Sequence, residues 1–464
     1  MTQFLRTTLQ AGSRSRQLAL RLALMFAAAW TSSASATELD DYVNTPDPAF
    51  RYELHAPSTV TKPTHESRVY HLVSQNWLTS EEVDRTLWEH WVTVCIPNDR
   101  EHAEALIMIG GGGNGGEAPS PSGALDQIAL QTKSVVVEIK QIPNQPLHFK
   151  GEQMDAYKQS GRKEDALITY GWDKFLDGGR AEWLARLPMT KAVVRAMDLV
   201  QKEVPGVERF FVLGGSKRGW TTWTVAAVDK RVMGIAPAVI DVLNFVPSLD
   251  NHINAYGFWA PAVSEYEEMN ITGRYHSERM GELLAIVDPY SYIDRLTMPK
   301  YIVNSAGDQF FPPNSSKYYF DDLKGEKYLR YMPNTDHGLS LEAYLNVASF
   351  YHALRNNTPR PEFTWKSEAD GTLEVRCVTE PEKVLLWQAH NPKARDFRME
   401  EIGKVWTSTP LEAVDGAYTA RLDQPETGYS AYFIEVTFKN PAFALPFVFT
   451  TGVNIVPDTY PAKN

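Results

Sequence analysis

The sequence feature with the most specific chemistry is a serine set among glycines. In Arg209–Trp220, which reads RFFVLGGSKRGW, an apolar run ends in Gly214 and Gly215, Ser216 follows, and a helical pattern begins soon after. A strand, a tight turn and a helix in this order present a serine hydroxyl for attack, and the helix N-terminus favours developing negative charge. The second glycine, Gly219, stands one residue later than in the motif G-x-S-x-G, so the turn taken alone also fits a structural role.

An acid and a base follow the serine in an order that matches one catalytic arrangement. A predicted strand at 301–304 leads into Asp308, and the next predicted strand, 328–332, leads into His337. Serine, acid and histidine at successive strand ends are the α/β-hydrolase order, in which the histidine takes the serine proton and the acid orients the imidazole. Asp241, after a predicted strand at 233–239, is an alternative acid.

A glycine-rich loop supplies candidates for the oxyanion hole. The predicted strand 105–109 runs into six glycines and one asparagine at 110–116. In an α/β-hydrolase, one oxyanion N–H comes from this loop and the other from the residue after the nucleophile. We therefore expect N–H donors from Lys217 and from Gly111 or Gly112. The loop lacks the G-x-x-x-x-G-K-[ST] pattern of phosphate binding.

Two polar residues beside these candidates are possible substrate contacts. Asn114 offers a side-chain amide, and Arg218 offers a guanidinium for an oxyanion or for an acidic substrate group, with a surface ion pair as the alternative. The sequence has no C-x-x-C, no H-E-x-x-H and no Asp-rich calcium loop. We therefore expect neither a metal nor another cofactor.

The order of elements predicts an α/β fold with a doubly wound, mostly parallel sheet. Strand-like and helical segments alternate from about residue 68 to 356, and several strand candidates are continuous apolar runs, as strands buried on both faces should be. The clearest helix is predicted at Pro188–Val204. The eight strand candidates are Val69–Ser74, Trp88–Cys95, Ala105–Ile109, Ser134–Ile139, Arg209–Leu213, Met233–Val239, Tyr301–Asn304 and Tyr328–Met332.

The chain divides into three predicted regions. Residues 1–36 contain a basic stretch, an apolar run and an Ala-Ser-Ala end, which predict a signal peptide for export, with a mitochondrial presequence as the main alternative. Residues 37–360 form the hydrolase domain, in which 141–187 and 241–296 interrupt the alternation as lid insertions or as surface decoration. Short strand candidates in 361–464 predict a β-sandwich-like domain with no triad candidate, so we expect a structural or recognition role.

Composition bears on three properties: nucleic-acid binding, membrane anchoring and disulfide formation. The formal net charge of -11 argues against nucleic-acid binding, which needs a basic surface. No stretch is long and apolar enough for a transmembrane anchor. Cys95 and Cys377 stand far apart in the sequence, and we favour two structural thiols over a disulfide.

Long stretches of the sequence resemble one protein family. The chain is similar to the PhoPQ-activated pathogenicity-related proteins, a resemblance that covers nearly all of the mature chain. It implies an exported α/β-hydrolase-like protein linked to virulence and to resistance against cationic peptides. The Gly-x-Ser-x-Arg-Gly turn is more distantly similar to carbohydrate esterases such as glucuronoyl and acetyl xylan esterases. The segments that carry the family resemblance are Leu39–Val43, Ser74–Trp77, Pro188–Asp198, Gly214–Trp220 and Leu386–Pro392.

These residues favour a serine hydrolase, with an esterase as the first hypothesis. The substrate would then be a small ester or a peptide, opened through an acyl-enzyme on Ser216. A peptidase with the same mechanism is the second hypothesis. The third is a secreted binding or signalling protein that keeps the fold without turnover.

Overall fold

The computed structural model describes residues 37–120 and 123–461. The predicted signal peptide, residues 1–36, lies outside the described residues. From Glu38 onward the chain forms one unit by its internal contacts.

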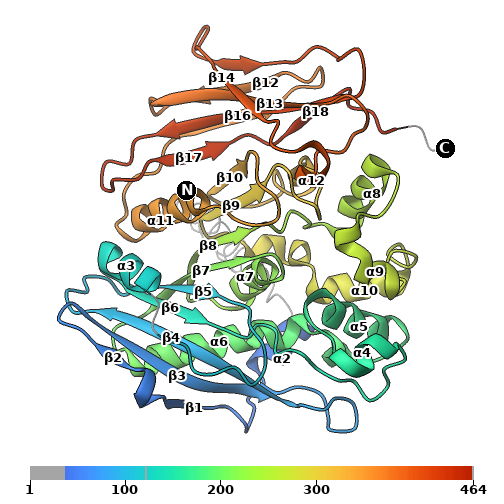
Figure 1. The fold of residues 1–464 in the computed structure, drawn as a ribbon. Coiled ribbons are helices and arrows are strands. Elements are labelled where there is room, and N and C mark those ends of the chain that lie inside the picture. Colours follow the sequence, from blue (N-terminus) through green and yellow to red (C-terminus); the bar gives the residue numbers. More distant parts are fainter. Residues whose placement is uncertain (1–36, 121–122, 462–464) are drawn as a thin grey trace, which may run out of the picture. The chain divides into compact units, whose positions relative to one another are not determined.

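A large mixed sheet organises this unit (Figure 1). Its central order is β3-β4-β6-β5-β7-β8-β9-β10, and the six strands from β6 to β10 are parallel to one another. The eight predicted strands all exist, and they form this central run. Their bounds are β3 His65–Asn76, β4 Leu87–Pro97, β5 Glu104–Ile109, β6 Val135–Ile139, β7 Arg209–Gly215, β8 Val232–Ala238, β9 Lys300–Ser305 and β10 Lys327–Met332.

Helices cover both faces of the sheet, which confirms the α/β-hydrolase fold class. Alternate residues of β7 belong to different apolar cores: Phe210 and Val212 pack with α6 and α7, whereas Phe211 and Leu213 pack with α3 and α11. No helix in the described residues is both long and apolar enough to cross a membrane. The helices are α2 Glu38–Asn44, α3 Gly123–Thr132, α4 Asp155–Ser160, α5 Glu164–Leu176, α6 Arg186–Glu203, α7 Lys217–Val228, α8 Phe245–Tyr256, α9 Ser264–Glu268, α10 Glu278–Val287, α11 Leu341–Arg355 and α12 Met399–Ile402.

The two predicted insertions contain helices of their own. The segment 141–187, after β6, holds α4 and α5, and the segment 241–296, after β8, holds α8, α9 and α10. These helices lie together beside the carboxyl ends of the parallel strands (Figure 1). Loops after parallel strands are where an open α/β sheet forms its clefts.

The C-terminal β-rich region is present, and it also extends the central sheet. Strand β17 pairs with β10 through Leu329 and Thr450, and β16, β13 and β14 follow in order. A second sheet, β11-β12-β15, packs Leu373 and Val375 into the same core as Ile434 and Val436 of β16. The remaining strand bounds are β1 Arg51–Leu54, β2 Val60–Thr61, β11 Phe363–Ser367, β12 Leu373–Cys377, β13 Lys383–Asn391, β14 Thr407–Pro410, β15 Tyr418–Ala420, β16 Tyr429–Phe438, β17 Phe447–Thr450 and β18 Asn454–Val456.

Polar bonds join this region to the hydrolase strands. The Tyr301 hydroxyl of β9 donates to the Val448 carbonyl at 2.6 Å. Arg330 of β10, which is almost fully buried, forms an ion pair of 2.7 Å with Glu435 of β16. Breaking a buried pair on one side leaves an uncompensated charge. The region beyond residue 360 is therefore bonded into the central sheet.

Candidate active site

Ser216 occupies a sharp turn between β7 and α7. Its backbone has φ 57° and ψ -128°, a left-handed conformation that costs free energy for a residue with a side chain. Two glycines make the turn possible: a Cβ at Gly214 would lie 2.4 Å from the Arg218 carbonyl oxygen, and one at Gly219 would lie 2.9 Å from the Ala238 carbonyl oxygen. The hydroxyl is thus held at a strained strand-to-helix turn.

The structure brings Ser216, His337 and Asp308 together. His337 Nε2 lies 2.7 Å from Ser216 Oγ, and His337 Nδ1 lies 2.8 Å from Asp308 Oδ2. Ser216, His337 and Asp308 follow β7, β10 and β9, respectively. His337 is 121 residues from Ser216 and 29 residues from Asp308 in the chain. Each contact is within hydrogen-bond reach, the geometry that a nucleophile, a base and an orienting acid require.

Local bonds fix the acid and the imidazole. Asp308 is buried, and its Oδ1 accepts from the Phe310 amide at 2.7 Å, which leaves Oδ2 for His337. The Gln309 side-chain oxygen accepts from the His337 amide at 2.9 Å. The Phe310 ring lies 4.3 Å from the imidazole, centroid to centroid. One loop therefore orients the histidine, bonds its backbone and covers its ring.

The C-terminal region holds both of these loops. The Met399 amide of α12 donates to the Gly307 carbonyl at 2.9 Å, next to Asp308. Asn334 stands three residues before His337. Its side chain accepts a hydrogen bond from the Trp406 amide at 3.0 Å and donates one to the Trp406 carbonyl at 2.9 Å. No pattern in the sequence connects residues 399–406 with the site, because they bond the backbone of the two loops and carry no chemistry of their own.

The alternative acid, Asp241, is engaged elsewhere. It is buried, and its two oxygens accept bonds of 2.6 Å from the hydroxyls of Tyr319 and Tyr331. Burial raises the pKa of Asp241 to about 7, although the tyrosine bonds act in the opposite direction. Among the described residues, Asp241 forms no hydrogen bond or ion pair with His337, whereas Asp308 does.

The glycine loop lies against Arg218. A Cβ on Gly111 would lie 2.7 Å from Arg218 Nη2, so the guanidinium packs directly on the Gly111 backbone. Arg218 Nε donates to the Ile142 carbonyl at 2.6 Å, and Nη2 forms an ion pair of 2.6 Å with Glu164. Gly112 adopts φ 132°, which favours glycine. Arg218 thus packs against the predicted oxyanion loop, and its Nε and Nη2 groups already donate to other protein groups.

The other two predicted site residues are Lys217, which is adjacent to Ser216, and Asn114, which bonds another loop. Lys217 is the first residue of α7, and its backbone amide is one of the four at a helix start without an intrahelical acceptor. The Lys217 side chain bonds Glu164 at 3.0 Å and Asp165 at 3.1 Å. Asn114 Nδ2 donates to the Pro146 carbonyl at 2.9 Å and is not among the residues that line the pocket beside Ser216.

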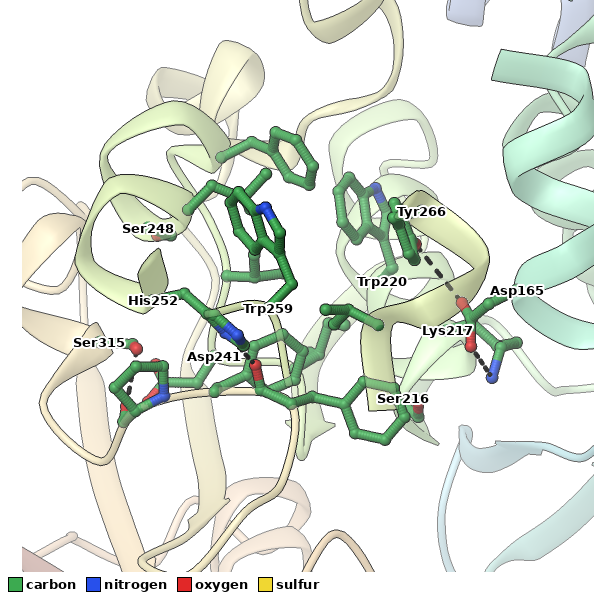
Figure 2. Close-up of a pocket in the computed structure, with 18 of the residues that line it drawn as sticks. Asp165, Ser216, Lys217, Trp220, Asp241, Ser248, His252, Trp259, Tyr266 and Ser315 are labelled. Atoms are coloured by element: carbon green, nitrogen blue, oxygen red, sulfur yellow. Dashed lines mark hydrogen bonds and ion pairs between the residues drawn. The ribbon is translucent and has the colours of Figure 1, made fainter. Parts of the chain in front are cut away.

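A mostly apolar pocket opens beside Ser216 (Figure 2). Its cavity volume is about 60 Å³, and most of its walls come from the second insertion and from the loop after β9. Figure 2 shows Asp165 bonded to Tyr266 and Lys217 on one side, with Asp241 and His252 on the other. The sequence places the insertions near a cleft but does not identify its apolar walls, which include Trp220, Ile240, Val242, Phe245, Leu249, Trp259, Val263, Phe310 and Phe311.

Both cysteines are free thiols, and one lies in a buried polar cluster away from the pocket. Ligand atoms of Cys95, His65 and Asp126 fall within 4.8 Å of one another. Lys62 Nζ already lies 2.7 Å from Asp126, and the Ser67 hydroxyl donates to it at 2.9 Å. Burial raises the pKa of Cys95 to about 12. Lys62 therefore already balances the charge of Asp126, and the cluster is a buried polar group beside β3 and β4.

The strand order, the strained serine turn and the position of the apolar pocket define a protein of the α/β-hydrolase fold. The chain belongs to the PhoPQ-activated pathogenicity-related protein family, whose family model matches residues 39–398. It is 35% identical over 480 residues to Autocrine proliferation repressor protein A of Dictyostelium discoideum, which covers 95% of this chain and 94% of the relative.

Solved structures with a similar fold include two carbohydrate esterases. Acetyl xylan esterase 1 from Thermoanaerobacterium sp. JW/SL YS485 has 17% identity and a TM-score of 0.49, over 68% of this chain and 93% of that one. The glucuronoyl esterase from Solibacter usitatus has 12% identity and a TM-score of 0.39, over 67% and 87%.

Proposed function

We propose that this protein is a serine hydrolase that cleaves carboxylic esters, with Ser216, His337 and Asp308 as its catalytic triad. The observation that carries this proposal is the pair of contacts at His337, 2.7 Å to Ser216 Oγ and 2.8 Å to Asp308 Oδ2. Ser216 also lines an apolar pocket. A hydroxyl, a base and a buried acid in one line are the parts that acyl transfer needs.

In the first half of the reaction, Ser216 becomes acylated. His337 Nε2 takes the hydroxyl proton while Ser216 Oγ bonds to the ester carbonyl carbon. The carbonyl oxygen becomes an oxyanion, for which the Lys217 amide and the loop of Gly111 and Gly112 are the proposed donors. The imidazolium is stabilised by Asp308. It then gives its proton to the departing alcohol as the ester C–O bond breaks.

In the second half, water replaces the alcohol. His337 takes a proton from water, and the resulting hydroxide adds to the acyl carbon. Collapse of this second intermediate breaks the Ser216 Oγ–C bond, the proton returns to Ser216, and the carboxylic acid leaves. The steps consume one water and need no metal or redox partner.

The pocket favours a short acyl group. A cavity of about 60 Å³ with apolar walls suits a few carbon atoms better than a peptide side chain and backbone. We include export in this proposal because residues 1–36 have the pattern of a signal peptide. A role in pathogenicity is suggested by the family description alone.

A fluorophosphonate probe and a panel of acyl substrates test the proposal. Wild type should be labelled and should hydrolyse p-nitrophenyl acetate, whereas Ser216→Ala and His337→Ala should each lose at least about 10³-fold in kcat while they stay folded. Ser291→Ala, a serine of the second insertion that bonds the Leu284 carbonyl, is the matched control.

Three outcomes would contradict the proposal. Full activity of Ser216→Ala would exclude Ser216 as the nucleophile. A preference for cationic peptides over every ester would make the protein a peptidase. An unlabelled, inactive wild type would favour a binding protein that keeps the fold without turnover.

A further inference from the structure

A buried arginine without a carboxylate partner lines the pocket beside Ser216. Arg186 is 2% exposed and borders the same cavity as the serine. None of the ion pairs within 4.0 Å in residues 37–120 and 123–461 includes Arg186. Buried charges are normally paired, because an unpaired charge loses its hydration without compensation. The burial of Arg186 without an ion pair therefore needs a physical explanation.

Three groups contact the Arg186 guanidinium, and one of them is the Tyr266 side chain, which hydrogen-bonds it. Nη1 donates to the Lys217 carbonyl at 2.9 Å, and the guanidinium carbon lies 4.3 Å from the centre of the Trp220 ring. Nε is buried and has no hydrogen-bond partner. A guanidinium can bind a carboxylate through two parallel N–H groups. The carbonyl, the tryptophan and the tyrosine thus hold the cation in place, while Nε has no hydrogen-bond partner in the protein.

Among the described residues, no carboxylate forms an ion pair with Arg186 within 4.0 Å, although the charge of Asp165 favours the protonated guanidinium. Glu164 bonds Arg218 at 2.6 Å and Lys217 at 3.0 Å, and Asp165 bonds Lys217 at 3.1 Å. This cluster holds three cations against two carboxylates, a net charge of one positive unit beside the pocket. Across the pocket, the oxygens of Asp241 accept from two tyrosines.

The position of Arg186 in its helix adds to the positive potential. Arg186 is the first residue of α6, and no acidic residue stands in that first turn. Helix N-termini carry partial positive charge, so a cation there is unfavourable. Arg355 gives the contrast: it is also buried with unpartnered nitrogens, but it lies in the last turn of α11, where a cation is favourable. Burial lowers the pKa of Arg186.

We propose that this pocket selects esters whose short acyl chain ends in a carboxylate, and that Arg186 binds that carboxylate. The inference rests on the proposed function for the bond that is cleaved. Arg186 bonds the residue next to Ser216, so the carboxylate and the scissile carbonyl must lie only a few bonds apart. The apolar walls suit the methylenes between them. The substrate class is therefore a half-ester of a short dicarboxylic acid.

The first experiment compares matched esters. Monomethyl esters of malonate, succinate, glutarate and adipate are each assayed beside a neutral isostere whose free carboxylate is a primary amide, with released methanol as the readout. For at least one length, wild type should favour the carboxylate by about tenfold or more in kcat/KM, the range of a hydrogen bond to a charged group. A ratio near one at all four lengths would overturn the inference.

Variants then assign the selectivity to Arg186. Arg186→Gln should bring the ratio close to one, and Arg186→Lys should keep part of it because the charge remains without the planar donors. Arg355→Gln removes another buried, unpaired arginine outside the pocket and should leave the ratio as in wild type. An unchanged ratio in Arg186→Gln would contradict the assignment. If that variant does not fold, Arg186→Lys and the wild-type ratios decide.

A binding measurement separates this inference from the proposed chemistry. Calorimetry on Ser216→Ala should detect the preferred half-ester, and Ser216→Ala/Arg186→Gln should bind it at least about tenfold more weakly. If wild type cleaves no ester but Ser216→Ala binds the half-ester, the pocket inference stands and the proposed function fails. If wild type cleaves neutral and anionic esters alike and binding ignores Arg186, the function stands and this inference fails.

Discussion

Asn334 and Trp406 are joined by two hydrogen bonds that connect the histidine loop to the C-terminal region. The Asn334 side chain accepts from the Trp406 amide at 3.0 Å and donates to its carbonyl at 2.9 Å, across 72 residues of chain. Asn334 adopts φ 56°, and His337 follows three residues later. The pair fixes a left-handed turn at the base of the loop that carries the imidazole.

Asn334→Gly tests this connection, because glycine keeps the backbone conformation and removes only the side-chain bonds. We expect a loss of about 1–2 kcal/mol in unfolding free energy, since two backbone groups of Trp406 lose their partners. We also expect kcat for p-nitrophenyl acetate to fall by about tenfold, because a misplaced base is costly in catalysis. Asn357→Gly, at an exposed left-handed asparagine, is the control and should keep wild-type kcat. Equal kcat in both variants would assign the pair to stability alone.

Asp308→Asn should cost far more activity than Asp241→Asn. In the first variant, an amide N–H or a weaker acceptor faces His337 Nδ1, so the required tautomer is lost, and we expect about 10³–10⁴-fold in kcat. In the second, the tyrosine bonds to residue 241 change while the contact of 2.8 Å between His337 and Asp308 remains. Ester hydrolysis at pH 7.5 ranks the two. The reverse ranking would transfer the role of the acid to Asp241.

Ser216→Gly should be more stable than Ser216→Ala, although both lose the nucleophile. A non-glycine residue at φ 57° and ψ -128° costs about 1–3 kcal/mol, and glycine relieves this strain. The larger unfolded-state entropy of glycine offsets part of the gain, so we expect a difference of about 1 kcal/mol by urea unfolding. Ala156→Gly, at an exposed position of the regular helix α4, should show the opposite sign. A glycine variant less stable than the alanine variant would mean that the turn is not strained.

Asp241 should make the wild type less stable as pH rises. Burial raises its pKa to about 7, against about 3.9 in an unfolded chain. Between these values the folded protein binds a proton that the unfolded chain does not, so unfolding free energy falls as pH rises from about 4 to 7. Each pKa unit corresponds to about 1.4 kcal/mol, which gives a total on the order of 4 kcal/mol.

Asp241→Asn lacks this titration, so its stability relative to wild type should improve between pH 5 and pH 8. Urea unfolding of both proteins at the two pH values gives the difference directly. Asp288, whose pKa burial raises to about 6, is present in both proteins and cancels. A difference that does not change with pH would show that Asp241 is ionised in the fold throughout this range.

The fold could be predicted from the sequence because parallel strands that are buried on both faces need continuous apolar runs, which are visible in the sequence. The sequence predicts strands such as β6, with the sequence VVVEI, and the helix at Pro188–Val204 close to their observed bounds, and the strand order confirms the fold class. The sequence does not indicate the short strands β1, β2, β14 and β18, because β1, β2 and β14 carry mostly exposed residues and β18 has only three residues.

The candidate triad was also predictable, because strand ends at one edge of a parallel sheet must meet. Ser216, Asp308 and His337 follow β7, β9 and β10. Which side chains stay free was decided by tertiary structure. From the sequence, Arg218 is the candidate beside the serine, yet its Nε and Nη2 groups bond Ile142 and Glu164. Arg186, 30 residues before Ser216, borders the pocket.

Charge partners of this kind come from segments far apart in the chain, so local pattern contains no signal for them. The same reason applies to the C-terminal region. Its sequence predicts short strands, but the pairing of Thr450 with Leu329 and the bonds of Trp406 to Asn334 depend on which surfaces meet. The sequence determined the elements and the order of the chemical groups; the packing of distant segments decided which of those groups face the pocket.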